Sequence, residues 1–178
     1  MGNEMKTVFV CLLLAGSIHQ LASAQESPRG ELIRLVDALD EPEFYCFDLA
    51  GWGKNLELDD PLQTHTCKAT GFDDQLFELT GSRIKIAGSD RCIQVAGSSG
   101  VTLPGSAVLA RPCSESPLQK ISLRDNGLLQ ITGTGYCIGA GAESKPASGP
   151  SHLWRTLAVV DCAKTDASLS TWQRVAAR

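Results

Sequence analysis

Six of the seven cysteines recur with a fixed period, and this period constrains the fold more than any other feature. The first cysteine of each pair follows the previous one after 46 and then 45 residues, and the separations within the pairs are 21, 21 and 25 residues. A period of this length marks repeated supersecondary units. Six cysteines allow fifteen pairings in principle, but the repeat favours one bridge inside each unit: Cys46–Cys67, Cys92–Cys113 and Cys137–Cys162.

The amino terminus has the pattern of a secretory signal peptide. An apolar run over residues 8–16 is followed by small residues that end at Ala24, the expected cleavage site. The run is too short to span a bilayer, and no later segment reaches a transmembrane length. Residues 1–24 are therefore predicted to be removed together with Cys11. Residues 25–178 would then form a secreted, extracellular domain, or a periplasmic one in a bacterium, where disulfides persist.

Each unit contains short runs of alternating apolar residues, which predict β-strands bounded by Gly, Asn and Asp. One run precedes the first cysteine, one follows it, one leads into the second cysteine, and one comes last. Residues 32–39, LIRLVDAL, also fit an amphipathic helix, but their match to RIKIA in the second unit favours a strand. The sequence thus predicts an all-β chain of three four-stranded repeats, at about residues 30–80, 81–124 and 125–178. Three such repeats around a pseudo-threefold axis form a β-trefoil, a closed form that hides sheet edges.

The charge of the chain argues against nucleic acid and membrane surfaces as partners. The formal net charge is −4, whereas DNA, RNA and anionic lipid attract basic faces. We therefore predict no nucleic-acid partner.

The sequence also lacks the motifs of common enzyme and metal sites. HExxH, GxSxG and EF-hand patterns do not occur. Asp59-Asp60 and Asp73-Asp74 are adjacent carboxylates, which tend to point apart, whereas glycosidases need two carboxyls on opposite sides of one bond. His152 has no partner nearby in sequence and is interpreted as a loop residue. The prediction is a protein without enzymatic activity that needs no cofactor or metal.

The cysteine pattern, together with a Gln-x-aromatic (QxW) signature in each unit, resembles ricin B-type lectin domains. The three copies of the signature are QLF at residues 75–77, QKI at residues 119–121 and STW at residues 170–172. They stand in step with the cysteine pairs over about residues 30–175. The resemblance implies a β-trefoil whose core contains the third residue of each signature: Phe77, Ile121 and Trp172.

The resemblance also implies a sugar site in the first unit. In sugar-binding members, an Asp two residues after the first cysteine accepts hydrogen bonds from two vicinal sugar hydroxyls, and Asp48 has this place. An ionised carboxylate suits the role because it only accepts and forms charge-assisted bonds. Gln63 and Gln75 would add hydrogen bonds, and His65 or Trp52 would lie against the apolar face of the sugar ring. The alternative for Asp48 is a loop carboxylate that caps backbone N–H groups.

The candidate sugar site departs from the family pattern at one position, and the other units depart at most positions. Asp74 stands where binding members usually have Asn, and an ionised Asp cannot donate. The second and third units lack the acidic anchor, so that we predict one site. The residues in the matching places are Gln94, Leu109, Arg111 and Leu118 in the second unit, and Gly139, Ala158, Val160 and Leu169 in the third.

These features predict a carbohydrate-binding module that binds a galactose- or N-acetylgalactosamine-like sugar reversibly, mainly through the first repeat. A single shallow site should be weak, about 0.1–1 mM, so that clustered glycans or glycoconjugates would supply avidity. The alternative is a trefoil that binds no sugar and acts through a partner protein, as an inhibitor or toxin subunit. Its candidate surface is the polar loop over residues 142–151. A secreted hydrolase is a more distant alternative.

Overall fold

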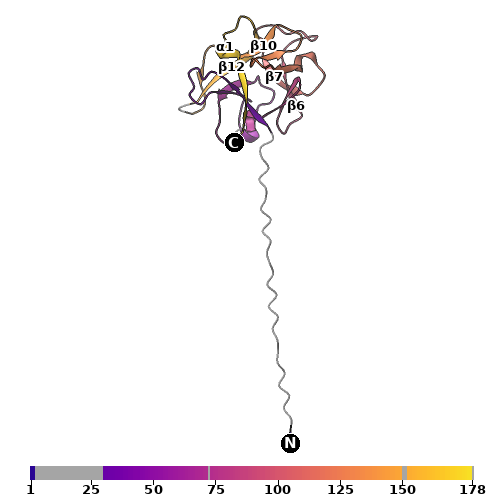
Figure 1. Cartoon of the computed structure of the whole chain (residues 1–178), viewed down its shortest axis with the longest axis vertical. Helices are drawn as coiled ribbons and strands as arrows, with labels where there is room; N and C mark the ends of the chain where they lie inside the picture. Colours follow the sequence, from indigo (N-terminus) through magenta and orange to yellow (C-terminus); the bar gives the residue numbers. More distant parts are fainter. Residues whose placement is uncertain (3–29, 72, 150–151, 178) are drawn as a thin grey trace.

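Short strands are the main regular secondary structure of the described chain, as the alternating apolar pattern predicts. The computed structural model describes residues 1–2, 30–71, 73–149 and 152–177, so that the predicted signal peptide lies outside it apart from the first two residues. Thirteen strands and one four-residue α-helix occur among the described residues (Figure 1). The all-β prediction is confirmed. The strands are β1 Glu31–Leu35, β2 Tyr45–Asp48, β3 Gln63–Thr66, β4 Phe77–Thr80, β5 Arg83–Ile86, β6 Arg91–Val95, β7 Val108–Pro112, β8 Ile121–Leu123, β9 Leu129–Ile131, β10 Tyr136–Ala140, β11 Lys145–Pro146, β12 Leu153–Asp161 and β13 Trp172–Ala176. The helices are the 3-10 turns η1 Gly53–Asn55, η2 Asp73–Gln75 and η3 Pro117–Gln119, and the α-helix α1 Ala167–Ser170.

The structure confirms the strand favoured for one ambiguous segment and lengthens another predicted strand. The LIRLVDAL segment, compatible with helix or strand in the sequence, contains β1, which pairs with β13 over its whole length from Glu31↔Ala176 to Leu35↔Trp172. The stretch before the last cysteine forms a longer strand than its apolar run indicates, since β12 begins at Leu153. The two-residue strand β11 lies inside the predicted loop and pairs with the start of β12.

The strands join into one hydrogen-bonded path, in the order β7-β6-β5-β4-β1-β2-β3-β12-β10-β9-β8, with β11 on β12 and β13 on β1. Pairing of the first described strand with the last brings the two ends of the domain together, as Figure 1 shows where the chain enters and leaves the body. Further backbone bonds cross between distant segments, for example from Leu62 to Val108 at 2.8 Å. Because these bonds link the first, second and third parts of the chain, few strand edges are left open.

Each disulfide links one strand to the chain just after the strand that pairs with it. The bonds are Cys46–Cys67, Cys92–Cys113 and Cys137–Cys162, the pairs that the periodic spacing predicts. In each pair the first cysteine lies within a strand and the second lies just beyond the end of the adjacent strand. In the chain-entropy model, loops of this size each stabilise the fold by roughly 3 kcal/mol.

The apolar core contains the third residue of each Gln-x-aromatic signature, as predicted. Phe77, Ile121 and Trp172 are all buried. The ring of Phe47 contacts Phe77 and Trp172 edge to face, with centroid distances of 5.9 and 4.7 Å. The Trp172 indole N–H donates to the carbonyl of Ile138 at 2.9 Å, so that its one polar group is satisfied inside the core.

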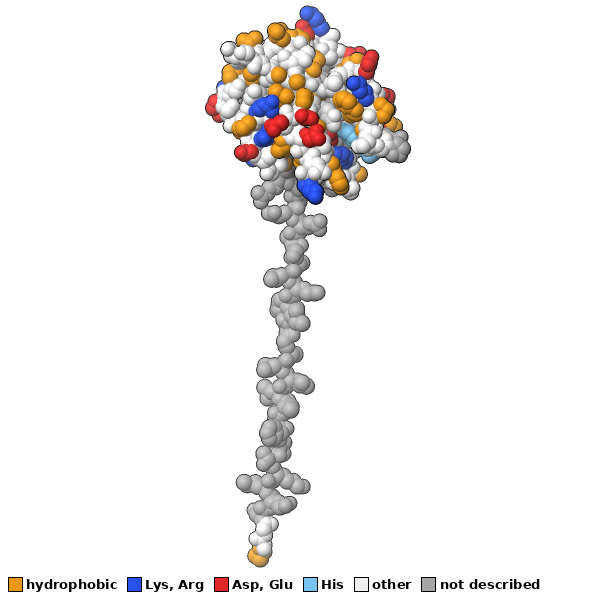
Figure 2. All heavy atoms as spheres, turned by 180° about the vertical axis from the view of Figure 1, so that it is seen from behind, with side chains coloured by type: hydrophobic (Ala, Val, Ile, Leu, Met, Phe, Trp, Pro, Cys, Tyr) orange, Lys and Arg blue, Asp and Glu red, His pale blue; other side chains and the backbone are white. Residues whose placement is uncertain are grey.

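Acidic and basic side chains are interspersed over the face shown in Figure 2, without a continuous basic patch. This distribution agrees with the small negative net charge. Among the residues that the structure describes, no helix is long and apolar enough to cross a membrane.

Candidate functional site

Strands β2 and β3 bring the predicted site residues of the first unit together. The two strands pair antiparallel, with Asp48 directly opposite Gln63 and Cys46 directly opposite His65. Because side chains of directly opposed residues lie on the same face of a sheet, the two-residue spacing after the first cysteine and the four-residue spacing before the second bring the carboxylate and the amide into contact. The local sequence therefore builds the centre of the site.

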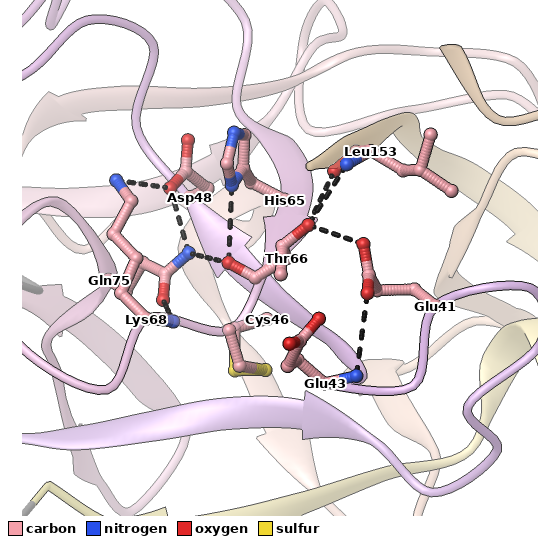
Figure 3. Close-up of a disulfide and its surroundings, with 10 residues drawn as sticks. Glu41, Glu43, Cys46, Asp48, His65, Thr66, Lys68, Gln75 and Leu153 are labelled. Carbon is pink, nitrogen blue, oxygen red and sulfur yellow. Dashed lines mark hydrogen bonds and ion pairs between the residues drawn. A yellow bond between two sulfur atoms is a disulfide. The ribbon is translucent and has the colours of Figure 1, made fainter. Parts of the chain in front are cut away.

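The Asp48 carboxylate is almost completely buried and is held by three side chains. Its side chain is 2% exposed. Gln63 Nε2 donates to Oδ1 at 3.0 Å. Gln75 Nε2 donates to Oδ2 at 2.9 Å, and Lys68 Nζ lies 3.4 Å from Oδ2 (Figure 3). Among the described residues, no backbone N–H donates to this carboxylate. The hydrogen bonds to Asp48 in the described part of the chain come from side chains.

Competing effects act on the ionisation of Asp48. Burial raises the pKa of this carboxyl, and the neighbouring carboxylate of Asp74 adds to the rise. The ammonium of Lys68 and the hydrogen bonds from Gln63 and Gln75 lower the pKa, but the balance remains above the ordinary value. The positive charge of Lys68 thus favours the ionised form of Asp48. This is the form that accepts hydrogen bonds from ligand hydroxyls with both carboxylate oxygens.

Lys68, which the sequence analysis did not single out, pairs with Asp74 beside Asp48. Lys68 Nζ pairs with Asp74 Oδ2 as well as with Asp48, and the Asp74 side chain is fully buried. Asp74 Oδ1 has no hydrogen-bond partner within the described part of the chain. Asp74 does not line the cavity, so it acts behind the site, as a partner of Lys68, and not in the direct role of the usual Asn.

Gln75 also lies behind Asp48 and holds the loop after the second cysteine. Besides Asp48, its amide N–H donates to the carbonyl of Thr66 at 3.1 Å, and its side-chain oxygen accepts from the backbone N–H of Lys68 at 3.0 Å. The side chain is fully buried. Gln75 therefore positions Asp48 and Lys68 and does not reach the cavity.

A cavity of about 750 Å³ opens above Asp48. Trp52, which is 69% exposed, and His65 line it, together with Gln63. Its opposite wall comes from the third unit. The residues that line the cavity are Asp48, Gly51, Trp52, Asn55, Glu57, Gln63, His65, Lys68, Pro146, Ala147, Ser148, His152 and Trp154.

Two of these lining residues were missed by sequence reasoning. His152, interpreted as an isolated loop residue, packs edge to face against His65 with a centroid distance of 5.6 Å. Trp154 lies directly opposite His65 across the β3–β12 pair. No local spacing relates these residues to the first unit, because the contact depends on how the third unit pairs with the first.

The second unit reproduces the support of the site without its acidic anchor. Gln119 donates to Gln94 at 3.0 Å and to the carbonyl of Pro112 at 2.9 Å, and accepts from the backbone N–H of Ser114 at 2.8 Å. These bonds correspond one for one to those of Gln75. Leu109 stands opposite Gln94, whereas in the first unit Gln63 stands opposite Asp48. The second unit therefore lacks the side-chain amide that accompanies Asp48.

The third unit has no space for an anchor at the matching position. Gly139 stands opposite Ala158, and a Cβ at Gly139 would lie 3.0 Å from a Val160 methyl group and 3.3 Å from the carbonyl oxygen of Leu169. The matching site is therefore filled by the protein itself. Within the described residues, no cluster of three or more His, Cys, Asp or Glu side chains is arranged to hold a metal ion.

Solved structures with a similar fold include a β-trefoil lectin. The chain resembles the β-trefoil lectin of the Vibrio vulnificus hemolysin/cytolysin, solved with N-acetyl-D-lactosamine bound, at a TM-score of 0.53 and 15% identity over 83% of this chain and 96% of that one. It also resembles the mdaA-1 domain, solved in solution, at a TM-score of 0.58 and 15% identity over 82% and 88% of the two chains. No family model matches the sequence, and the curated proteins give no match. At this identity the likeness shows the β-trefoil fold alone.

Proposed function

We propose that this protein is a secreted, ricin-type lectin module that binds a galactose- or N-acetylgalactosamine-like sugar reversibly through its first repeat. The chain would be a β-trefoil of three four-stranded repeats, at about residues 30–80, 81–124 and 125–178, behind a signal peptide over residues 1–24. One observation carries the proposal: the Asp48 carboxylate lies at the base of an aromatic-lined cavity, with the Gln63 amide beside it. The three disulfides are consistent with an extracellular location.

The hydrogen-bonding capacity of Asp48 leaves room for a ligand. An ionised carboxylate offers about four acceptor positions, and Gln63, Gln75 and Lys68 occupy three. A sugar hydroxyl would take the fourth, and a vicinal hydroxyl would donate to the side-chain oxygen of Gln63. Trp52 would lie against the apolar face of the ring, since its exposed indole borders the same cavity. Lys68 also borders the cavity and would donate to a ligand oxygen.

The binding step involves no covalent chemistry. The paired carboxylates Asp48 and Asp74 share one ammonium group on the same side of the cavity floor, whereas a glycosidase places its two carboxyls on opposite sides of the bond that breaks. The proposed role is therefore recognition, with affinity supplied by clustered glycans.

A glycan array probed with the multimerised protein tests the proposal, followed by titration calorimetry on the best sugar. Wild type should bind glycans that end in galactose or N-acetylgalactosamine, and Asp48→Asn should lose at least about tenfold in affinity because it removes a charge-assisted bond. The matched control is Gln94→Asn, at the same strand position of the second unit, which should bind as wild type does. Absence of binding to every glycan by the multimerised wild type would contradict the proposal.

One observation favours the alternative of a trefoil that acts through protein contacts. Val101 and Leu103, on the loop between β6 and β7, are 64% and 63% exposed. Exposed apolar side chains so close in sequence suit a protein interface better than a glycan. If the array is negative, substitution of these two residues by Ser is the next experiment, with capture of a partner as the measurement.

A further inference from the structure

We infer that the cavity binds a glycan of at least two sugar units, and that the second unit lies on a surface formed by Trp154 and His152. This inference rests on the proposed sugar site at Asp48 and extends it. It assigns to the third unit, which has lost its own anchor position, a part in the site of the first.

The β3–β12 pairing places the second surface beside the first. Trp154 stands directly opposite His65, and Thr156 stands directly opposite Gln63. Directly opposed residues have Cβ atoms about 4.5–5.5 Å apart on one face of the sheet. Lys145 on β11 continues the row, opposite Trp154. The sheet face that carries the proposed sugar site therefore runs on without interruption into the third unit.

The size of the cavity fits a ligand larger than one hexose. Cavities of roughly 300–1,000 Å³ accommodate drug-sized ligands, which are about as large as a di- or trisaccharide, and this cavity has about 750 Å³. Its lining divides into two groups. Asp48, Trp52 and Gln63 belong to the first unit, whereas His152 and Trp154 belong to the third.

The second surface has the chemistry that sugars require. Trp154 is half-buried, so its ring is held in place while part of it faces the cavity. The ammonium of Lys145 lies 5.2 Å from the centre of that ring and can donate to ligand oxygens there. His152 is exposed at the rim and contacts His65, and an imidazole both donates and accepts. An aromatic side chain with polar groups close by suits a pyranose ring, and among the described residues Trp154 and His152 both line this cavity.

A buried arginine fastens the third-unit wall of the cavity to the first unit. Arg155, 5% exposed, donates to the carbonyls of Gly141 and Ala142 at 2.9 and 2.5 Å and to the Asp40 carboxylate at 2.5 Å. Ser144 donates to the other oxygen of Asp40 at 2.5 Å. These bonds fix the start of the loop whose next residues line the cavity. A wall held in this way is preorganised, which reduces the entropy lost on binding.

Titration calorimetry with one- and two-sugar ligands tests the inference. The probes are galactose, N-acetylgalactosamine and N-acetyl-D-lactosamine. Wild type should bind the disaccharide about tenfold more tightly than either single sugar. Trp154→Ala should abolish this difference. His152→Ala, at an exposed position that adds little to folding, should reduce the difference, and Leu103→Ala is the control outside the cavity.

The outcomes separate the inference from the proposed function. Equal affinities for single sugars and the disaccharide, or an unchanged difference in both Trp154→Ala and His152→Ala, would overturn the two-sugar site while the lectin function stands. Loss of single-sugar binding in a folded Trp154→Ala protein would overturn the division into two surfaces. No binding of any probe or array glycan by wild type would overturn the lectin function and this inference together.

Discussion

The carboxylate of Asp48 and the ammonium of Lys68 form an ion pair at 3.4 Å, in which the carboxylate is 2% and the lysine side chain 19% exposed. A second carboxylate, Asp74, pairs with the same ammonium and is completely buried. Two buried carboxylates beside one cation carry a net negative charge, which is costly in a site of low dielectric. The ammonium of Lys68 therefore offsets part of the cost of burying this charge.

Replacement of Lys68 by Met should destabilise the protein at neutral pH by about 3 kcal/mol, the lower end of the range for a broken buried ion pair, because Lys68 retains some contact with water. The variant should regain stability on acidification. Lys68 lowers the pKa of Asp48, so its loss raises that pKa further above the unfolded value. The native state then binds protons at a higher pH than the unfolded state, and stability rises as the pH falls through that window. Urea unfolding between pH 7 and pH 4 measures the effect.

The double variant Lys68→Met, Asp74→Asn is the control for this charge argument. Removing one of the two carboxylates should restore part of the stability at pH 7 and flatten the dependence on pH. A loss in Lys68→Met that is equally large at both ends of the pH range would show that packing of the lysine stem, and not charge, stabilises the site.

The corresponding glutamines of the first and second units should contribute equally to stability and differently to function. Gln75 and Gln119 are both buried and make the same three bonds in their units. Changing either to Leu removes the side-chain partner of one backbone N–H and one hydrogen bond to a backbone carbonyl, at a total cost of about 1–3 kcal/mol.

The two glutamine variants are compared by urea unfolding and by sugar titration. Both should unfold at lower urea concentration than wild type by similar amounts. Only Gln75→Leu should weaken glycan binding, because Gln75 positions Asp48 whereas Gln119 contacts Gln94. Equal effects on binding from both variants would show that the site responds to overall stability and not to the placement of Asp48.

The features that the sequence predicted are those that depend on short spacings. The cysteine pairs and the strand that carries Asp48 follow from alternation and from the period of the cysteines, whereas the burial of Trp172 was implied by the resemblance to ricin B-type domains. The contact between Asp48 and Gln63 could also be predicted from the sequence, since both positions are counted from cysteines that form one disulfide. Local rules suffice where the repeat itself sets the register.

The remaining part of the site depends on register between units. His65 meets Trp154 only because β3 pairs with β12, and the two strands are far apart in the sequence. The polar stretch that contains β11 did not predict a strand, because a two-residue strand with exposed side chains has no apolar alternation. Lys68 was missed for a different reason: its role follows from two carboxylates that become neighbours only in the folded chain.

A side chain at Gly139 should be accommodated only at a cost in stability, because it would crowd neighbouring atoms of the third unit. A Cβ there would lie 3.0 and 3.1 Å from the two Val160 methyl groups, so Gly139→Ala should cost about 1–3 kcal/mol through overpacking. Gly135→Ala in the same unit is the matched control, since a Cβ at Gly135 meets no atom within 4 Å. Thermal unfolding should show a lower midpoint for the first variant alone. Equal midpoints for both would mean that the strand shifts to make room.

Asp40→Asn tests the fastening of the cavity wall through its dependence on pH. Burial opposes the ionisation of Asp40, but hydrogen bonds from Ser144, Arg155 and Tyr45 outweigh it and hold the pKa of this carboxyl well below its ordinary value. A depressed folded-state pKa contributes stability that is present above the unfolded value, about 4, and is lost as the pH falls below it. Wild type should therefore be more stable than Asp40→Asn at pH 7, and the gap should narrow below about pH 4.

The same variant, Asp40→Asn, should weaken binding of the two-sugar ligand more than binding of the single sugar. Asn binds the Arg155 guanidinium less strongly than a carboxylate does, so the loop over residues 141–148 loses its fixed position. Thermal unfolding from pH 7 to pH 2.5 and calorimetry at pH 7 with both ligands provide the two measurements. A constant stability gap across the pH range would contradict the charge-assisted role of Asp40. If the difference in stability narrows at low pH but both ligands lose affinity equally, Arg155 stabilises the fold without shaping the cavity wall. A looser wall would weaken the binding of the second sugar first, because that sugar contacts it.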